Sequence, residues 1–354
     1  MGLFDRFKPD SPTMRVCMMG PKAVGKTTVM TSVFNETQQS IAGTSLNLTA
    51  RGETNAALTE KYHELSSVFA DRSTITDNNG KSSSQNVTNM GMYASAVQTG
   101  LFFGFGHLGK EPVIQLQIKD FPGEMVVKEP ESVMKFINES QSIFIAIDTP
   151  HLMERNGEFN AVKNKPKQIT DLFRKAISDI KSEKLVIFIP LKCEKYFHEG
   201  RMGEVLNKIQ STYAELIKLL DSTKKVCCCI EPILTLGDVE FDDFSYDASG
   251  NVLLAPDGCP ANVKYKYVGE GKYSPLFCSQ PLYSLLLFVA AQYKREKART
   301  GIFARIKNMI WDAFKKDESL LDDILKMNTN RITNNEKLGY KVLCGAYLFN
   351  VKDN

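Results

Sequence analysis

The sequence predicts an α/β fold of three layers, in which helices cover both faces of a mostly parallel sheet that includes an antiparallel hairpin strand. A glycine-rich loop at 20–27 follows a strand-like run and precedes a helical pattern. Residues 142–148 and 185–191 are continuous apolar runs, as expected of central strands that are covered on both faces. Helical patterns at 167–181 and 202–220 separate such runs, and this alternation favours parallel pairing.

Local sequence patterns predict the remaining elements. Apolar runs predict strands, and apolar residues at helical spacing predict helices. Two of the strands, at 93–105 and 113–119, are joined by a glycine-rich hairpin turn at 104–109. The other predicted elements are strands at 14–19 and 225–236, helices at 28–34, 54–69, 280–298 and 318–327, and an apolar segment at 340–351 that is a strand or a docking segment.

These elements predict three parts of the chain. They are an N-terminal tail (1–13), a main domain (14–293) and a C-terminal part (294–354), which begins as a basic amphipathic helix and continues as an extension. Within the main domain, 35–90 is a long polar region, and 237–275 is an insert rich in Gly, Asp and Pro.

Composition and charge argue against several classes of protein. The chain has 354 residues, of which 43% are hydrophobic and 24% charged, and its formal net charge is only +3. This weak charge and the lack of DNA-binding motifs argue against a nucleic-acid partner. The eight cysteines lack zinc-type spacing, and the three in 226–230 indicate a buried strand. Since no apolar run reaches transmembrane length and no signal peptide is evident, we expect a cytoplasmic protein.

The most informative stretch is the loop 20–27, whose sequence Gly-Pro-Lys-Ala-Val-Gly-Lys-Thr fits the pattern G-x-x-x-x-G-K-[ST] at every position. Gly20 and Gly25 allow the loop to fold back, so that successive backbone N–H groups point at phosphate oxygens. Lys26 would reach the β- and γ-phosphates, and the Thr27 hydroxyl would bind Mg²⁺. The predicted nucleotide-binding residues of this loop are Gly20, Ala23, Val24, Gly25, Lys26, Thr27 and Thr28.

A second element of the site follows the strand at 113–119. The sequence Asp120-Phe-Pro-Gly123 places a carboxylate at the end of that strand and a glycine three residues later. Asp120 would hold a water bound to Mg²⁺, and Gly123 would offer its backbone N–H to the γ-phosphate. A simple turn is the alternative, but the position after an apolar strand downstream of the glycine loop favours a functional role.

With these motifs the chain resembles the Ras-like P-loop GTPases of the TRAFAC class, over about residues 14–236 and a closing helix near 281–293. The resemblance implies guanine recognition after a buried strand, where Lys192 and Glu194 match the Lys and Asp of an [NT]-K-x-D motif. Leu191 departs from the first position of that motif. The stem of Lys192 would lie along the base, and the carboxylate of Glu194 would accept its N–H groups. A solvated pair at the end of a strand is the alternative.

The resemblance also implies catalytic and metal-binding positions. Glu124 stands where the family often has the Gln that orients the attacking water. A switch threonine completes the Mg²⁺ shell in the family, and Thr88 is the expected one, with Thr76 and Thr99 as alternatives. The expected catalytic residues are Lys26, Gly123 and Glu124. The expected metal-binding residues are Thr27, Thr88 and Asp120.

The function implied is that of a GTP-binding molecular switch with Mg²⁺ and GTP or GDP as cofactors, and with 35–90 as an enlarged switch region. Slow hydrolysis is expected, because an ionised Glu124 cannot donate a hydrogen bond to the phosphate. The layout looks most like bacterial double-GTPase or GTPase-associated-system proteins, which implies regulatory or effector protein partners in a bacterial multi-gene system. Two alternatives remain: a P-loop ATPase, because of Leu191 and Glu194, and a nucleotide-binding interaction protein with little turnover.

The stretch 294–316 predicts a basic amphipathic helix. It has eight basic and two acidic residues, hence a charge of +6, and its apolar residues recur at helical spacing around the only tryptophan, Trp311. The pattern favours a helix docked on the core with a solvated basic face. Contact with a membrane surface or a protein partner is the alternative.

Overall fold

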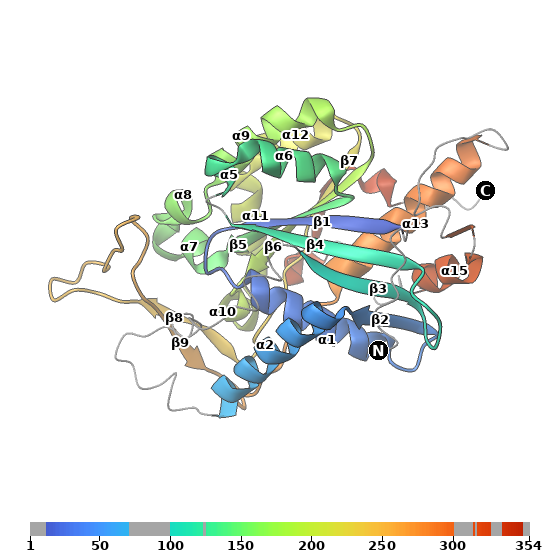
Figure 1. Ribbon diagram of the computed structural model, residues 1–354. Helices are drawn as coiled ribbons and strands as arrows, with labels where there is room; N and C mark the ends of the chain where they lie inside the picture. The colour runs from blue at the N-terminus through green and yellow to red at the C-terminus, as the bar shows by residue number, and fades with distance from the viewer. Residues whose placement is uncertain are drawn as a thin grey trace.

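A computed structural model describes residues 12–70, 100–122, 125–300, 314–315, 317–326 and 335–349 (Figure 1). Within these residues the main sheet has eight strands, in the order β10-β7-β6-β5-β1-β4-β3-β2, and a second sheet consists of β8 and β9. The strands are β1 (Thr13–Gly20), β2 (Leu46–Ala50), β3 (Leu101–His107), β4 (Ile114–Pro122), β5 (Ser142–Asp148), β6 (Lys184–Leu191), β7 (Val226–Ile230), β8 (Val239–Phe244), β9 (Val263–Tyr267) and β10 (Lys341–Cys344).

The helices lie mostly between the strands, as the alternating sequence pattern predicts. They are α1 (Lys26–Ile41), α2 (Gly52–Ala70), α5 (Met125–Lys128), α6 (Pro130–Glu139), α7 (Thr149–Met153), α8 (Asn160–Lys163), α9 (Pro166–Ala176), α10 (Glu194–His198), α11 (Met202–Thr212), α12 (Ala214–Ser222), α13 (Gln280–Thr300) and α15 (Glu318–Lys326). Short 3₁₀ turns follow at η1 (Glu154–Gly157), η2 (Ile177–Asp179), η5 (Glu336–Leu338) and η6 (Ala346–Leu348).

The pairing of the strands confirms the α/β class, the mostly parallel sheet and the antiparallel hairpin. β1 pairs in parallel with β4 and β5, β5 with β6, and β6 with β7. β3, β2 and β10 join antiparallel. The register places Gly20 opposite Pro122 and Asp148 opposite Leu191. Because parallel strands end at the same edge of the sheet, the residues that follow β1, β4, β5 and β6 come together there.

Helices cover both faces of the main sheet, since side chains on each strand alternate between the faces. On β1, Met14, Val16 and Met18 belong to a hydrophobic cluster that includes residues of α1, α2, α13 and α15. Cys17 and Met19 belong to a second cluster, with residues of α6, α9, α11 and α12. The sheet is therefore the middle of three layers, as Figure 1 shows.

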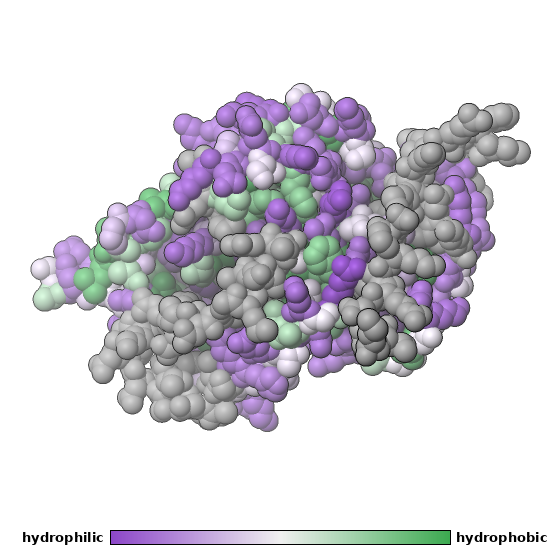
Figure 2. Space-filling view, in the orientation of Figure 1, coloured by the Kyte–Doolittle hydropathy of each residue, from purple (hydrophilic) through white to green (hydrophobic). Residues whose placement is uncertain are grey.

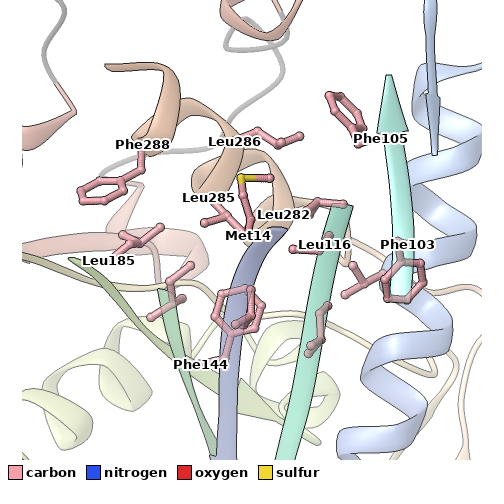
Figure 3. Packing of buried hydrophobic residues seen from close by; sticks show 14 of the residues in the cluster. Met14, Phe103, Phe105, Leu116, Phe144, Leu185, Leu282, Leu285, Leu286 and Phe288 are labelled. Atoms are coloured by element: carbon pink, nitrogen blue, oxygen red, sulfur yellow. The ribbon is translucent and has the colours of Figure 1, made fainter. Parts of the chain in front are cut away.

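Helix α13 belongs to this core although it lies near the C-terminal end of the chain. Figure 3 shows Leu282, Leu285 and Leu286 of α13 beside Met14 of β1, and all four are buried. Their spacing puts the three leucines on one helix face. Burying each leucine contributes roughly 1.5–3 kcal/mol. The predicted helix at 280–298 is confirmed, and it continues to Thr300, so residue 294 lies inside it.

On the opposite face, α9 shows how the sequence specifies a helix. Ile169, Leu172, Phe173 and Ala176 are buried, at the spacing of one helical stripe. Pro166 stands in the first turn, where its missing N–H costs nothing. The helix predicted at 167–181 is confirmed, although it ends at Ala176 and continues as the 3₁₀ turn η2.

The insert between β7 and α13 has its own small core. It contains the hairpin β8-β9 and an arm at 245–262, which projects from the body in Figure 1. Phe241 and Phe244 of β8 are buried together. Figure 2 shows apolar surface on the arm, where Leu253 and Leu254 are exposed.

The C-terminal segments pack on the main domain. Leu320, Leu321 and Ile324 of α15 are buried in the cluster with α13, which confirms the helix predicted at 318–327. The apolar segment at 340–351 contains the edge strand β10, which pairs with β7. Of the predicted basic helix, 294–300 continues α13, whereas 301–313 lies outside the described residues. In the part of the chain described here, no helix has the length and apolar character needed to cross a membrane.

Several boundaries differ from the prediction for physical reasons. The run at 225–236 leaves the sheet after Ile230, and Pro232, which has no N–H for a strand partner, follows. The pattern at 202–220 forms two helices, because the backbone of Tyr213 is not helical. β2 was not predicted, since its alternation is short and lies in a polar region. The hairpin strand begins at Leu101, and 93–99 lies outside the described residues.

Candidate functional site

The loop 20–27 connects the end of β1 to the start of α1. Gly20 lies against β5, because a Cβ at this position would be 2.8 Å from both Cβ and O of Ala146. Ala23 (φ 57°) and Gly25 (φ 102°) have left-handed backbone, and Gly25 is the residue before the first turn of α1. A non-glycine residue such as Ala23 in this conformation is strained, and such strain is concentrated at functional sites.

The ammonium group of Lys26 is held inside the loop. It donates to the carbonyl oxygens of Gly20 at 3.1 Å and Pro21 at 3.0 Å. It also lies 3.6 Å from Oδ1 of Asp120, and its side chain is only 7% exposed. The first residue of α1 therefore places a largely desolvated cation at the loop.

Two further lysines bind the next two carbonyl oxygens of the loop. Nζ of Lys163, at the end of α8, donates to O of Lys22 at 3.1 Å. Nζ of Lys192, the residue after β6, donates to O of Ala23 at 3.2 Å. Together with Lys26, these side chains bind four successive carbonyl oxygens, those of residues 20–23.

The backbone N–H groups of the loop are left on the opposite side of these peptides. In a trans peptide the C=O and N–H bonds point in opposite directions. Lys163 and Lys192 bind the carbonyl oxygens of Lys22 and Ala23. The N–H groups of the same two peptides, those of Ala23 and Val24, therefore point away from the two lysines. The N–H groups of residues 22–25 donate no hydrogen bond to any group in the described part of the chain. With the N-terminus of α1, they form a set of donors suited to an anion.

Asp120 faces Lys26 from the neighbouring strand. β4 extends to Pro122, so Asp120 lies within the strand, opposite Met18 of β1. Its Oδ1 is buried and accepts no hydrogen bond from any described residue. Burial raises the pKa of Asp120, and the charge of Lys26 opposes this rise. A buried carboxylate oxygen of this kind fits a hard cation or its bound water.

Asp148, the last residue of β5, is a fully buried carboxylate beside the loop. Its Oδ2 lies 3.0 Å from Nζ of Lys192, and its Oδ1 lies 2.6 Å from Nδ1 of His151. The amide of Asn164 binds both the N–H and the C=O of Asp148, at 2.8 and 3.1 Å. Burial alone would raise the pKa of Asp148, but Lys192 and His151 outweigh it and hold the pKa well below its usual value.

Glu194, the expected base-binding carboxylate, lies among backbone N–H groups. It is only 2% exposed, and its Oε1 accepts the N–H of Leu236 at 3.2 Å. Burial raises the pKa of Glu194 to about 7, although the N–H groups of Leu236 and Thr235 favour the ionised form. Leu191, which precedes this turn, is buried in the core. Of the predicted base-binding pair, only Lys192 bonds directly to the loop in this structure.

The insert at 237–275 takes part in the same site. Nζ of Lys192 lies 5.8 Å from the ring centroid of Tyr265 on β9. Burial would lower the pKa of Lys192, but Asp148 and Tyr265 outweigh it and hold the pKa above its usual value. Lys192 therefore remains charged beside an aromatic ring.

The other predicted site residues lie in or near this arrangement, or outside the described part of the chain. Val24 is buried and Thr28 is partly buried at the start of α1. The side chain of Thr27 and the whole of Gly123 and Glu124 are outside the described residues. The same holds for Thr88, Thr76 and Thr99.

Five residues that the structure brings to the site were not predicted from the sequence: Asp148, His151, Lys163, Asn164 and Tyr265. For Asp148 the sequence did contain a signal, which the prediction left unused. Asp148 ends an apolar strand, just as Asp120 follows one. Lys163 and Asn164 carried none, since they belong to an irregular segment between β5 and α9. Only the fold brings that segment to the loop.

Comparisons with known proteins find no family model and no curated protein that matches this chain. Its function is therefore inferred from its own residues and their geometry.

Proposed function

We propose that the loop 20–27 binds the phosphate groups of a nucleoside di- or triphosphate with Mg²⁺, and that the protein is a P-loop GTPase switch with slow hydrolysis. One observation supports this most strongly. The carbonyl oxygens of residues 20–23 are bound by lysine ammonium groups, while the N–H groups of residues 22–25 donate to no described group. A loop oriented in this way offers its donors to an anion.

The charges around the loop agree with a polyphosphate ligand. Lys26 now donates to neutral carbonyl oxygens, and phosphate oxygens would replace them with stronger hydrogen bonds in which both the donor and the acceptor are charged. Helix α1 has no acidic residue in its first turn, so its positive end is not neutralised by its own side chains. The sequence pattern G-x-x-x-x-G-K-[ST] is the one expected for such a site.

Asp120 fits the metal ion that such a ligand carries. Its Oδ1 is buried, and the nearest cation, Nζ of Lys26 at 3.6 Å, is beyond hydrogen-bond distance, so an Mg²⁺ ion or its bound water would supply the missing partner. Thr27 and Thr88 are the other residues that we propose for this ion. Bound there, Mg²⁺ would offset the negative charge of the phosphates.

For hydrolysis, the residues of this chain would position groups and stabilise charge rather than form a covalent bond. Lys26 and the N–H groups of the loop and of Gly123 would stabilise the charge that develops on the γ-phosphate. Glu124 would accept a hydrogen bond from the attacking water, but its ionised form cannot donate one to the phosphate. We therefore propose slow turnover by the isolated protein, with an arginine of a regulatory partner as the natural means of raising it.

Guanine is the base that we propose, because Lys192 lies at the loop, where its stem would flank a base. The second candidate is a P-loop ATPase, and a specific observation favours it. Oε1 of Glu194 accepts the N–H of Leu236, so this carboxylate is already engaged in the fold. An engaged carboxylate is a poorer acceptor for the N–H groups of guanine.

The test is a titration of nucleotide-free protein with fluorescent GDP and fluorescent ADP in Mg²⁺, beside the variant Lys26→Ala. Tight binding of GDP that is lost in the variant supports the GTPase. Preference for ADP supports the second candidate. If the folded wild-type protein binds neither nucleotide, the proposed function is wrong.

A further inference from the structure

In the proposed function Lys163 is only one of three lysines that bind carbonyl oxygens of the loop, and its own part in phosphate binding is not yet described. It is the last residue of α8, a short helix in the irregular segment between β5 and α9. Its Nζ lies 3.1 Å from the carbonyl oxygen of Lys22, and its side chain is half-buried. The contact joins residues that are 141 positions apart in the sequence.

The segment that carries Lys163 is fixed to the end of β5. The side chain of Asn164 binds both backbone polar groups of Asp148 and also Oδ1 of Asn160, at 2.9 Å. The backbone is left-handed at Asn156 (φ 58°) and Lys165 (φ 51°), on either side of α8. Because these conformations and bonds define one path of the chain, the position of Lys163 is set by its own segment.

The electrostatics also indicate that Lys163 is held at the loop against a cost. Burial lowers the pKa of Lys163, Asp148 raises it, and the charge of Lys192 lowers it further. A lysine that was free to move would avoid this cost by extending its ammonium group into the solvent. The charge of Asp148 favours the ionised form of both lysines, and Asp257 also favours that of Lys163.

We propose that Lys163 is a positioning residue of the phosphate site: by binding the carbonyl oxygen of Lys22 it turns the N–H group of Ala23 toward the bound phosphate. Lys192, whose Nζ lies 3.0 Å from Oδ2 of Asp148, binds the next carbonyl oxygen of the loop, that of Ala23. This proposal rests on the proposed function, since it describes how the same site is organised. Lys163 acts through the backbone of the loop and not through contact with the phosphate.

Because the oriented group is a loop N–H, loss of Lys163 weakens recognition of phosphate whatever base is attached. We expect Lys163→Met to bind Mg²⁺ with pyrophosphate, GDP or ADP about tenfold more weakly than the wild type, by a similar factor for each ligand. A residue that contacts the base would instead change the ratio of GDP to ADP affinity and leave pyrophosphate unaffected. Lys163→Arg keeps a cation at this place, and we expect it to restore most of the affinity.

The experiment is isothermal titration calorimetry of the full chain with these three ligands. Lys167→Met is the matched control, because Lys167 is an exposed lysine at the start of α9 and its loss removes the same charge from the next helix along the chain. Thermal unfolding of each variant sets a titration temperature at which the protein is folded. We expect the control to bind like the wild type.

Three results would overturn the proposal while the proposed function stands. The first is that Lys163→Met binds all three ligands with unchanged affinity. The second is that Lys167→Met loses as much affinity as Lys163→Met. The third is that Lys163→Met loses affinity for one nucleotide but not for pyrophosphate. A wild-type protein that binds none of the three ligands overturns the proposed function, and this proposal with it.

Discussion

Nζ of Lys192 lies 3.0 Å from Oδ2 of Asp148, whose side chain is completely buried. Asp148 ends β5, and Lys192 follows Leu191, the residue of β6 that pairs with Asp148. The same ammonium group donates to the carbonyl oxygen of Ala23. This ion pair therefore connects two central strands to the loop 20–27.

Loss of the buried carboxylate should destabilise the protein. We expect Asp148→Asn to lower the free energy of unfolding by about 3 kcal/mol, because it leaves Lys192 beside a neutral group in a largely buried place. Urea unfolding at pH 7 measures this. The control is Asp221→Asn, which breaks an exposed pair with Lys224 and should cost less than about 1 kcal/mol. Equal losses in the two variants would contradict the prediction.

The same carboxylate predicts an acid dependence of stability. Since the pKa of Asp148 is held well below its usual value of 3.8, its contribution is complete above that pH and is lost as the pH falls below it. The difference in free energy of unfolding between wild type and Asp148→Asn should therefore be constant from pH 5 to 7 and shrink in stronger acid. Urea unfolding along a pH series tests this, and a difference that grows toward low pH would refute it.

Glu194 should show the opposite dependence. Burial raises its pKa from 4.5 to about 7, so the folded state binds this proton more tightly than the unfolded state. Its contribution to stability is complete below pH 4.5 and is lost as the pH rises to about 7. At about 1.4 kcal/mol per pKa unit, the whole change is of the order of 3 kcal/mol.

The measurement compares wild type with Glu194→Gln by urea unfolding between pH 4 and 8. We expect the stability of the wild type relative to the variant to fall through this range. The control is Glu204→Gln: the hydrogen bond from Arg201 lowers the pKa of the exposed Glu204, so its contribution should be lost only below about pH 4.5. A flat profile for Glu194 would mean that its carboxylate is not held in the buried position described.

Gly20 should not tolerate a side chain. In Gly20→Ala the new Cβ would lie 2.8 Å from the backbone oxygen of Ala146, and we expect a loss of about 1–3 kcal/mol. Gly52→Ala is the control, because a Cβ there meets nothing within 4 Å, and we expect no loss of stability. Thermal and urea unfolding measure both variants. A Gly20→Ala protein as stable as the wild type would show that β1 and β5 are not in such close contact.

Asp120 should account for the metal dependence of nucleotide binding. We expect removal of Mg²⁺ with EDTA to weaken GTP binding to the wild type strongly, and Asp120→Asn to lose most of this difference. Fluorescent-nucleotide titration with Mg²⁺ and with EDTA measures both proteins. The control is Asp171→Asn, a carboxylate on the exposed side of α9 that should respond to EDTA like the wild type. The assignment of Asp120 fails if its variant retains the full response to Mg²⁺.

Much of the fold follows from local sequence patterns. The apolar runs at 142–148 and 185–191 predicted two central strands, since strands covered on both faces need continuous apolar sequence. Apolar residues at helical spacing in 280–298 predicted α13, and the structure shows that it packs on the sheet. Boundaries were less well predicted. The apolar pattern at 202–220 continues across Tyr213, whereas the helix is interrupted there, because the backbone of Tyr213 is not helical.

The sequence by itself determined the glycine loop between β1 and α1 and the carboxylate of Asp120 near the end of β4, because these follow from the order of residues in short segments. Only the tertiary structure decided which side chains meet there. Lys163 and Asp148 come to the loop because parallel strands end at one edge of the sheet, and strand order and register are set by packing across the whole chain. For the same reason the sequence placed Glu194 near the site but did not show that the N–H of Leu236 would engage its carboxylate.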